Sequence, residues 1–161
     1  MKIINAALRT CGCIAGGCLF LLLFGCGGVG SRYGIVIPDG PRGEAVTAAL
    51  EEIGTTYRYG ASAPGKALDC SALTLHAHRE AGLKIPRTAN DQRRVAKPVS
   101  ASRAEPGDLV FFHIDSGNHV GLMVDETRFV HASSSKKNVR LANLGTPYWR
   151  RHLIGAGSYF D

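Results

Sequence analysis

The sequence Leu68-Asp69-Cys70-Ser71-Ala72-Leu73 begins an amphipathic segment that predicts a helix from about Cys70 to Leu83. At 100° per residue, one side of this helix carries a cysteine and apolar side chains, and the other side is polar. The inward side holds Cys70, Leu73, Ala77 and Ala81, and the outer side holds His76, Arg79 and Glu80. Gly82 is a typical helix end. We therefore expect Cys70 at a helix N-terminus, facing the interior.

Further helices precede strands along the rest of the chain. Apolar residues at helical spacing predict a helix from about Glu44 to Ile53, and Thr88 is a suitable N-cap for a short helix after Pro86. The second half has short apolar runs separated by turn residues, which are typical of strands. These runs are residues 109–112, 120–124, 129–132, 139–141 and 153–160. The order predicts an α+β domain, with N-terminal helices packed on a C-terminal antiparallel sheet.

Residues 1–25 have the pattern of a secretory signal. Two basic residues, Lys2 and Arg9, flank the start, and the apolar run from Ile14 to Phe24 is shorter than the roughly 20 residues that a membrane-spanning helix needs. A buried core helix is the alternative, but the interior glycines disfavour it.

The signal ends in Leu23-Phe24-Gly25-Cys26, which resembles a bacterial lipobox. We therefore expect lipid on Cys26, a glycine-rich tether over residues 26–40 and one domain over residues 41–161. Cleavage at another position, which would release a soluble exported protein, stays open as an alternative.

Cys70 is the one cysteine that this organisation leaves in the folded domain. Cys11, Cys13 and Cys18 fall in the expected signal, where no histidine accompanies them, so we expect no metal site there. An unpaired cysteine in an exported domain is either reactive or joined to another chain. Because a helix N-terminus favours the thiolate, we expect Cys70 to be a nucleophile with a lowered pKa.

Two of the six histidines are candidates for the base that such a nucleophile needs. If the hairpin turns at Asp125, His119 and His131 lie directly opposite each other on one face of two antiparallel strands. One histidine then accepts the thiol proton, and the second histidine orients the first, which gives a Cys-His-His triad. A one-residue slip in register would separate them. His113 is expected to be exposed.

Six short motifs occur in one order along the chain. They are Tyr57-Arg58-Tyr59-Gly60, Leu68-Asp69-Cys70-Ser71, Ile85-Pro86-Arg87-Thr88 with Gln92, Pro106-Gly107-Asp108-Leu109-Val110-Phe111-Phe112, Asn118-His119-Val120-Gly121 and Phe129-Val130-His131-Ala132-Ser133. Together they resemble the NlpC family of bacterial cell-wall cysteine peptidases, in particular its small lipoprotein murein endopeptidases. The resemblance covers about Gly43 to the C-terminus and implies a papain-like fold.

The resemblance also implies roles for individual residues. Cys70 would attack the scissile amide, His119 would act as general base and then general acid, and His131 would orient it. Tyr57 matches a tyrosine near the oxyanion site, and Asp69 and Ser71 match residues that shape the substrate cleft. Two positions depart from the family pattern, because Ala61 and Ala72 stand where glycine is usual. These departures put the shape of the cleft in question.

The implied activity is hydrolysis of an amide bond in peptidoglycan stem peptides, without metal or cofactor. The implied place is the bacterial cell envelope, on a lipid anchor, with the outer membrane facing the periplasm as the expected site. Without Lys2 and Arg9 of the expected signal, the net charge of +6 falls to +4, which suits an anionic polymer or lipid surface or simply belongs to a solvated basic surface. No nucleic acid is expected as a partner, because no run of Lys or Arg exceeds two residues. The alternatives are an amidase or acyl-transfer enzyme on the same fold, an inert lipid-anchored peptidoglycan-binding protein, and an exported antibacterial toxin.

Overall fold

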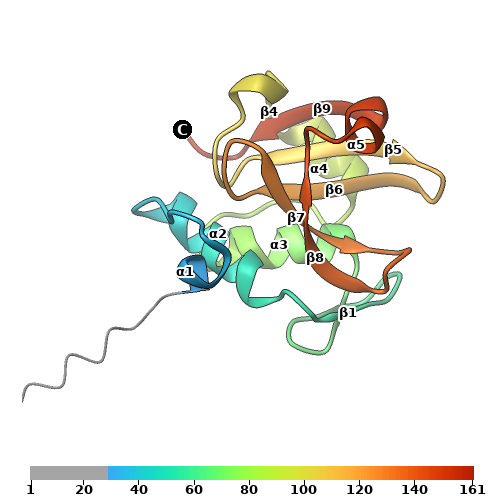
Figure 1. The fold of residues 1–161 in the computed structure, drawn as a ribbon, viewed down its shortest axis with the longest axis horizontal. Coiled ribbons are helices and arrows are strands. Elements are labelled where there is room, and N and C mark those ends of the chain that lie inside the picture. The colour runs from blue at the N-terminus through green and yellow to red at the C-terminus, as the bar shows by residue number, and fades with distance from the viewer. Residues whose placement is uncertain (1–28) are drawn as a thin grey trace, which may run out of the picture.

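The computed structural model describes residues 29–161. The expected signal over residues 1–25 and Cys26 lie outside the described residues. In chain order the elements are α1 (Val29–Tyr33), α2 (Pro41–Glu51), β1 (Thr56–Tyr57), β2 (Ser62–Ala63), β3 (Ala67–Leu68), α3 (Cys70–Glu80), α4 (Ala89–Val95), β4 (Lys97–Val99), a 3-10 turn (Ala101–Arg103), β5 (Leu109–Ile114), β6 (Gly117–Met123), β7 (Arg128–Ser133), β8 (Asn138–Asn143), α5 (Pro147–His152) and β9 (Leu153–Ser158). Helices α1, α2 and α3 lie on one side of a strongly twisted sheet, and α5 lies apart from them beside β5 (Figure 1).

The sheet has the strand order β2-β3-β1-β8-β7-β6-β5-β9-β4. Neighbouring strands are antiparallel throughout except for β1 and β3, which are parallel. Helix α3 packs against α2 and against β6 and β7, and Figure 1 shows these helices together on one side of the strands. The α+β prediction, with N-terminal helices packed on a C-terminal antiparallel sheet, is confirmed.

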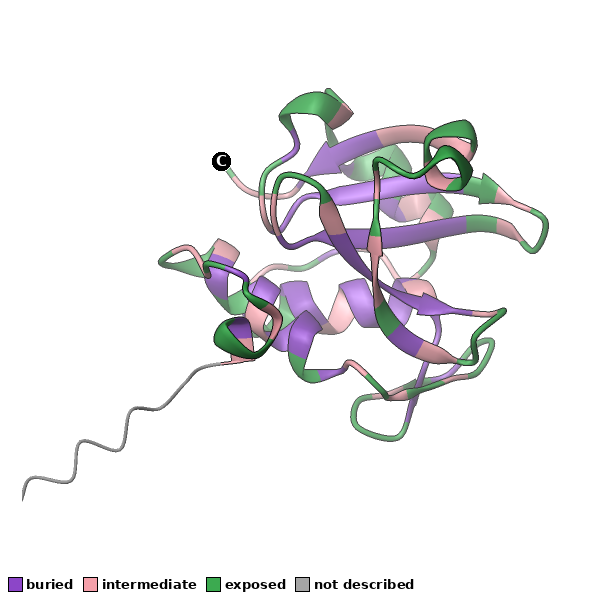
Figure 2. Cartoon of the chain, viewed as in Figure 1, coloured by how far each residue is buried: buried purple, intermediate pink, exposed green. Residues whose placement is uncertain are grey.

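Two hydrophobic clusters cover opposite faces of the central strands, because side chains alternate along a strand. Val120 and Leu122 of β6 face the cluster that contains α2 and α3, whereas Met123 belongs to the second cluster. The same alternation puts Val130 and Phe129 of β7 on opposite faces. Buried residues line α3 and the middle strands in Figure 2. By this alternation His119 and His131 lie on the face of the second cluster, away from α2.

Helix α3 starts at Cys70 as predicted but ends at Glu80, earlier than the predicted Leu83. Gly82 has a φ of 74°, and the N–H of Leu83 donates to the carbonyl of His78 at 2.8 Å. This is the usual glycine-dependent helix end, and it closes the helix one turn earlier.

The described part of the expected tether is packed on the domain. Residues Val29–Tyr33 form α1, and Ile35 is only 5% exposed. Arg128 donates from its guanidinium to the carbonyls of Tyr33 and Gly34. The glycine content of this segment predicted a tether, in which the apolar residues 35–37 either dock as a short strand or stay extended, and Ile35 is docked on the domain. None of the helices among residues 29–161 is long and apolar enough to span a bilayer.

Candidate active site

Cys70 is the first residue of α3, and Asp69 caps that helix. The Asp69 Oδ1 atom accepts a hydrogen bond from the backbone N–H of Ala72 at 2.7 Å. The thiol of Cys70 is half-buried, and the backbone N–H groups of Val120, Ser71 and Cys70 itself act on it to lower its pKa. Because Val120 directly follows His119, the thiol lies where the start of α3 meets β6.

The pKa of Cys70 is not lowered, as the helix position had predicted, but raised to about 11. Burial is the largest cause, and the Asp69 carboxylate acts in the same direction, while the three backbone N–H groups lower the pKa. The helix N-terminus favours the thiolate, but the loss of solvent around the buried sulfur outweighs that effect. Cys70 is therefore a neutral thiol at pH 7 and needs a base.

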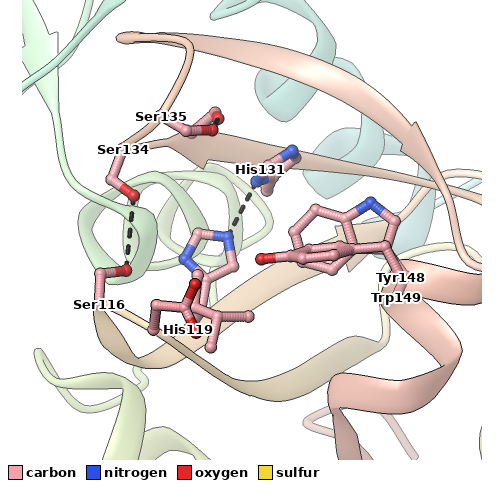
Figure 3. A pocket seen from close by; sticks show the side chains of 10 residues that line it. Ser116, His119, His131, Ser134, Ser135, Tyr148 and Trp149 are labelled. Atoms are coloured by element: carbon pink, nitrogen blue, oxygen red, sulfur yellow. Dashed lines mark hydrogen bonds between the residues drawn. The ribbon is translucent and has the colours of Figure 1, made fainter.

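His119 of β6 and His131 of β7 form a hydrogen-bonded pair. Their Nε2 and Nδ1 atoms, respectively, are 2.9 Å apart, and the ring planes are nearly perpendicular at 88°. Each residue is only 4% exposed. Figure 3 shows this hydrogen bond, with the indole of Trp149 beside the two imidazoles.

The register of the hairpin differs from the prediction. Leu122 pairs with Val130 and Met123 with Phe129, so the loop is centred on Glu126 and not on Asp125. The Asp125 carboxylate accepts hydrogen bonds from the N–H groups of Thr127 and Arg128, which lengthens the turn. The two histidines are therefore diagonal neighbours and not directly opposed. The observed pairing is shifted by two residues from the predicted one, and a shift of two keeps both side chains on the same face of the sheet. Side chains that are diagonal neighbours on one face can still meet.

Both histidines are neutral at pH 7. Burial lowers the pKa of His119 to about 4. Burial also lowers the pKa of His131 to about 3, with smaller contributions from His119 and Arg140. The hydrogen bond between the rings uses Nε2 of His119, so Nδ1 is the atom left to accept a proton.

The structure brings Cys70, His119 and Tyr57 to the lining of one cleft, here called the Cys70 cleft. His131 is not in its lining. It lies with His119 in a second pocket, here called the Trp149 pocket. His119 therefore lines both hollows and lies between the thiol side and His131. The pKa of Tyr57 is raised by burial and by the negative charges that Cys70 and Asp69 can carry, so its phenol keeps its proton.

Asp69 and Ser71 also line the Cys70 cleft, but their polar atoms are largely occupied within the protein. Arg87 donates to Asp69 Oδ1 at 3.0 Å, to Asp69 Oδ2 at 2.7 Å and to Ser71 Oγ at 2.8 Å. The same guanidinium contacts the carbonyls of Gly60 and Ala61 at 3.3 Å. No role was predicted for Arg87, although its motif follows the one that contains the acidic Asp69, which was a signal for an ion pair.

The two departures from the family pattern lie beneath the cleft. Ala61 is 8% exposed and Ala72 is 1% exposed, and neither belongs to the lining of the Cys70 cleft. Ala72 packs in the cluster beneath α3. The shape of the cleft is thus set by other residues. Among residues 29–161 there is no group of three His, Cys, Asp or Glu side chains that could hold a metal ion.

Sequence reasoning also missed Trp149, because it did not predict α5. Thr146-Pro147 was a usable signal for a helix start, since proline suits the first turn. The contact of Trp149 with the histidines is tertiary and has no signature in the local sequence.

Comparison with known proteins agrees with this architecture. Residues 54–158 match the model of the NlpC/P60 family. The chain is 35% identical over 118 residues to murein DD-endopeptidase MepH of Escherichia coli, covering 70% of this chain and 44% of that protein. It is 40% identical over 100 residues to the E. coli murein DD-endopeptidase MepS/murein LD-carboxypeptidase, covering 61% and 52%. The chain thus spans about half the length of these relatives.

A solved structure shows the same fold. The NLP/P60-family protein from Staphylococcus aureus described as similar to lipoprotein superposes with a TM-score of 0.68 at 30% identity, covering 79% of this chain and 44% of that one. The family match extends over more than half of the chain and includes both Cys70 and the histidine pair. The chain belongs to the NlpC/P60 family.

Proposed function

We propose that the protein hydrolyses an amide bond in the stem peptides of peptidoglycan, with Cys70 as the nucleophile. The observation that carries the proposal is that Cys70 and His119 line one cleft, with His119 hydrogen-bonded to His131. The relatives MepH and MepS are named as murein DD-endopeptidases, which supports peptidoglycan as the substrate.

The proposed reaction begins from a neutral thiol and a neutral imidazole, as their pKa values require. His119 takes the thiol proton at Nδ1 while the Cys70 sulfur attacks the carbonyl carbon. For Nδ1 to be free, the hydrogen of neutral His119 must sit on Nε2 and be donated to His131 Nδ1. His131 thereby fixes the tautomer and the orientation of the base.

Two donors are available for the oxyanion of the tetrahedral intermediate. We assign these roles to the protonated Tyr57 phenol and to the backbone N–H of Cys70. Collapse of the intermediate breaks the C–N bond, and His119 returns its proton to the leaving amine. Water, deprotonated by His119, then attacks the thioester, releases the carboxylic acid and restores the thiol.

Digestion of cross-linked muropeptides, analysed by mass spectrometry, tests this function. The wild type is expected to yield peptide fragments that differ from the substrate by one added water, and Cys70→Ala is expected to yield none. Release of the whole stem from the glycan would indicate an amidase, and new covalent linkages would indicate acyl transfer. Retention of intact muropeptides without cleavage would support the peptidoglycan-binding alternative and contradict the proposal.

We also propose that the protein is held at a membrane of the bacterial cell envelope, at the outer membrane facing the periplasm, by lipid on Cys26. The lipobox-like sequence before this residue supports the proposal.

A further inference from the structure

Helix α5 presents one large apolar side chain, Trp149, to the sheet. Its neighbours Tyr148 and Arg150 are exposed, whereas Trp149 is half-buried. The indole packs against Phe112 at 4.7 Å and Phe129 at 5.0 Å between ring centroids. Trp149 is therefore anchored on β5 and β7, on the face of the sheet that carries the histidine pair.

The same indole contacts both histidines. It is stacked on His119, with centroids 5.9 Å apart and planes 20° apart. It meets His131 edge-on, at 4.9 Å and 79°. The two imidazoles are themselves almost perpendicular, so one flat side chain touches each of them in a different orientation. Rotation of either ring away from the observed hydrogen bond would collide with the indole or open a gap beside it.

The environment of the pair explains what an aromatic side chain contributes there. Several charged and titratable groups surround the pair. The Cys70 cleft holds, together with His119, the side chains of Tyr57, Tyr59, Asp69, Cys70 and Arg87. Asp115 and Tyr148 line the Trp149 pocket with both histidines, and Arg140 of β8 contributes to the lowered pKa of His131. Among the salt bridges of residues 29–161, none pairs a carboxylate with His119 or His131. The imidazolium that forms during proton transfer thus has no carboxylate paired with it, and an aromatic face stabilises such a cation.

We propose that Trp149 is a positioning residue for the histidine pair, holding the two imidazoles in their hydrogen-bonded arrangement and covering them on one side. Its ring face also stabilises the charge that His119 gains from Cys70. The inference rests on the proposed role of His119 as the base. Trp149 itself is not among the residues that line the Cys70 cleft.

Three variants separate positioning from a structural role. Trp149→Leu removes the ring and keeps an apolar side chain, and Trp149→Phe restores a smaller ring. Leu153→Ala is the matched control, because Leu153 packs on the same cluster as Trp149 and has no recorded contact with either histidine. Should Trp149→Leu fail to fold, Trp149→Met, which fills the space without a ring, takes its place.

Steady-state kinetics on muropeptides form the first measurement. Trp149→Leu is expected to lower kcat about tenfold or more, with KM changed less than about twofold, because the base is misplaced and substrate contacts remain. Trp149→Phe is expected to recover most of kcat. In the wild type, activity rises with pH as His119 loses its proton at about 4. In Trp149→Leu both imidazoles are less buried, so the pKa of His119 is expected to rise. The rise of activity with pH is then expected about one pH unit higher than in the wild type.

Nuclear magnetic resonance of ¹⁵N-labelled histidine rings forms the second measurement and does not depend on activity. His119 is expected to be a single neutral tautomer with hydrogen on Nε2 in the wild type, and a mixture of tautomers in Trp149→Leu. If Trp149→Leu matches Leu153→Ala in kcat, pH profile and ring signals, the positioning role is refuted. If the wild type itself cleaves nothing, the proposed function fails, and the ring signals alone decide whether Trp149 holds the pair.

Discussion

The Nε2 atom of His119 lies 2.9 Å from the Nδ1 atom of His131, and this hydrogen bond joins β6 to β7 beyond the last recorded pair of their ladder, Leu122 with Val130. Where the backbone pairing of β6 and β7 has ended, the side chains of His119 and His131 still join the two strands. The space between them is filled by aromatic rings and opens into the Trp149 pocket. The bond therefore belongs both to the architecture of the sheet and to the proposed chemistry.

His131→Ala is predicted to reduce kcat about 100-fold, because His119 then loses the acceptor that fixes its tautomer. His131→Asn is predicted to retain more activity, since its amide oxygen can accept the same hydrogen bond. Steady-state kinetics on a muropeptide checks both variants. His113→Ala is the control, because His113 is exposed and bonds only to Asn118 among the recorded contacts. Equal activity of His131→Ala and wild type would exclude the orienting role.

Arg87→Ala is predicted to destabilise the fold by about 2 kcal/mol, because the 7% exposed Asp69 loses its charged partner. This value is below that of a fully buried pair, since the Arg87 side chain is 38% exposed. Arg87→Lys is expected to recover only part of the loss, because an ammonium cannot bridge Asp69, Ser71 and two carbonyls at once.

Urea denaturation measures these differences in the free energy of unfolding. The matched control is Arg94→Ala, which breaks an exposed pair with Asp91 and should change stability by less than about 0.5 kcal/mol. Similar effects of Arg87→Ala and Arg94→Ala would show that Asp69 does not depend on Arg87.

The protein is predicted to lose stability as the pH falls from about 6.5 to about 4, partly through His78. This side chain is fully buried, and burial lowers its pKa to about 4. In the pH window between the folded and unfolded pKa values, the unfolded state binds more protons, so acid favours unfolding. His119 and His131 act in the same direction.

Thermal unfolding of wild type and His78→Leu at pH 7 and pH 4.5 tests how much of the loss of stability in acid comes from His78. The Nε2 atom of His78 has no recorded hydrogen-bond partner, and Leu removes this titrating group at similar volume. The drop in Tm between the two pH values is expected to be smaller in the variant. A drop equal to that of the wild type would exclude His78 as a source of the acid sensitivity.

Most of the elements that position the site could be predicted from the sequence. The start of α3 followed from apolar spacing, and β5 to β9 followed from short apolar runs between turns. The register of β6 and β7 could not be predicted, because it depends on the hydrogen bonds of the Asp125 carboxylate within the loop. The raised pKa of Cys70 depends on burial by β6, and the contact of Trp149 with the histidines exists only after folding. Neither the pKa of Cys70 nor the contact of Trp149 can be predicted from the spacing of residues along the chain.

Cys26→Ala is predicted to abolish incorporation of a labelled fatty acid into the protein and to release it from the membrane fraction. Growth of cells with the labelled fatty acid, followed by gel analysis, is the measurement. Cys18→Ala is the matched control, because that cysteine lies in the expected signal and should not alter labelling of the mature protein. Persistent labelling of Cys26→Ala would contradict the anchor.

The central claim is that the thiol of Cys70 performs the cleavage of stem peptides. Its most direct test is the rate at which Cys70→Ala cleaves a defined cross-linked muropeptide, compared with wild type at equal folded concentration. We predict that the rate falls at least about 1,000-fold, because no other group replaces the nucleophile. A rate within about tenfold of the wild type would contradict the claim.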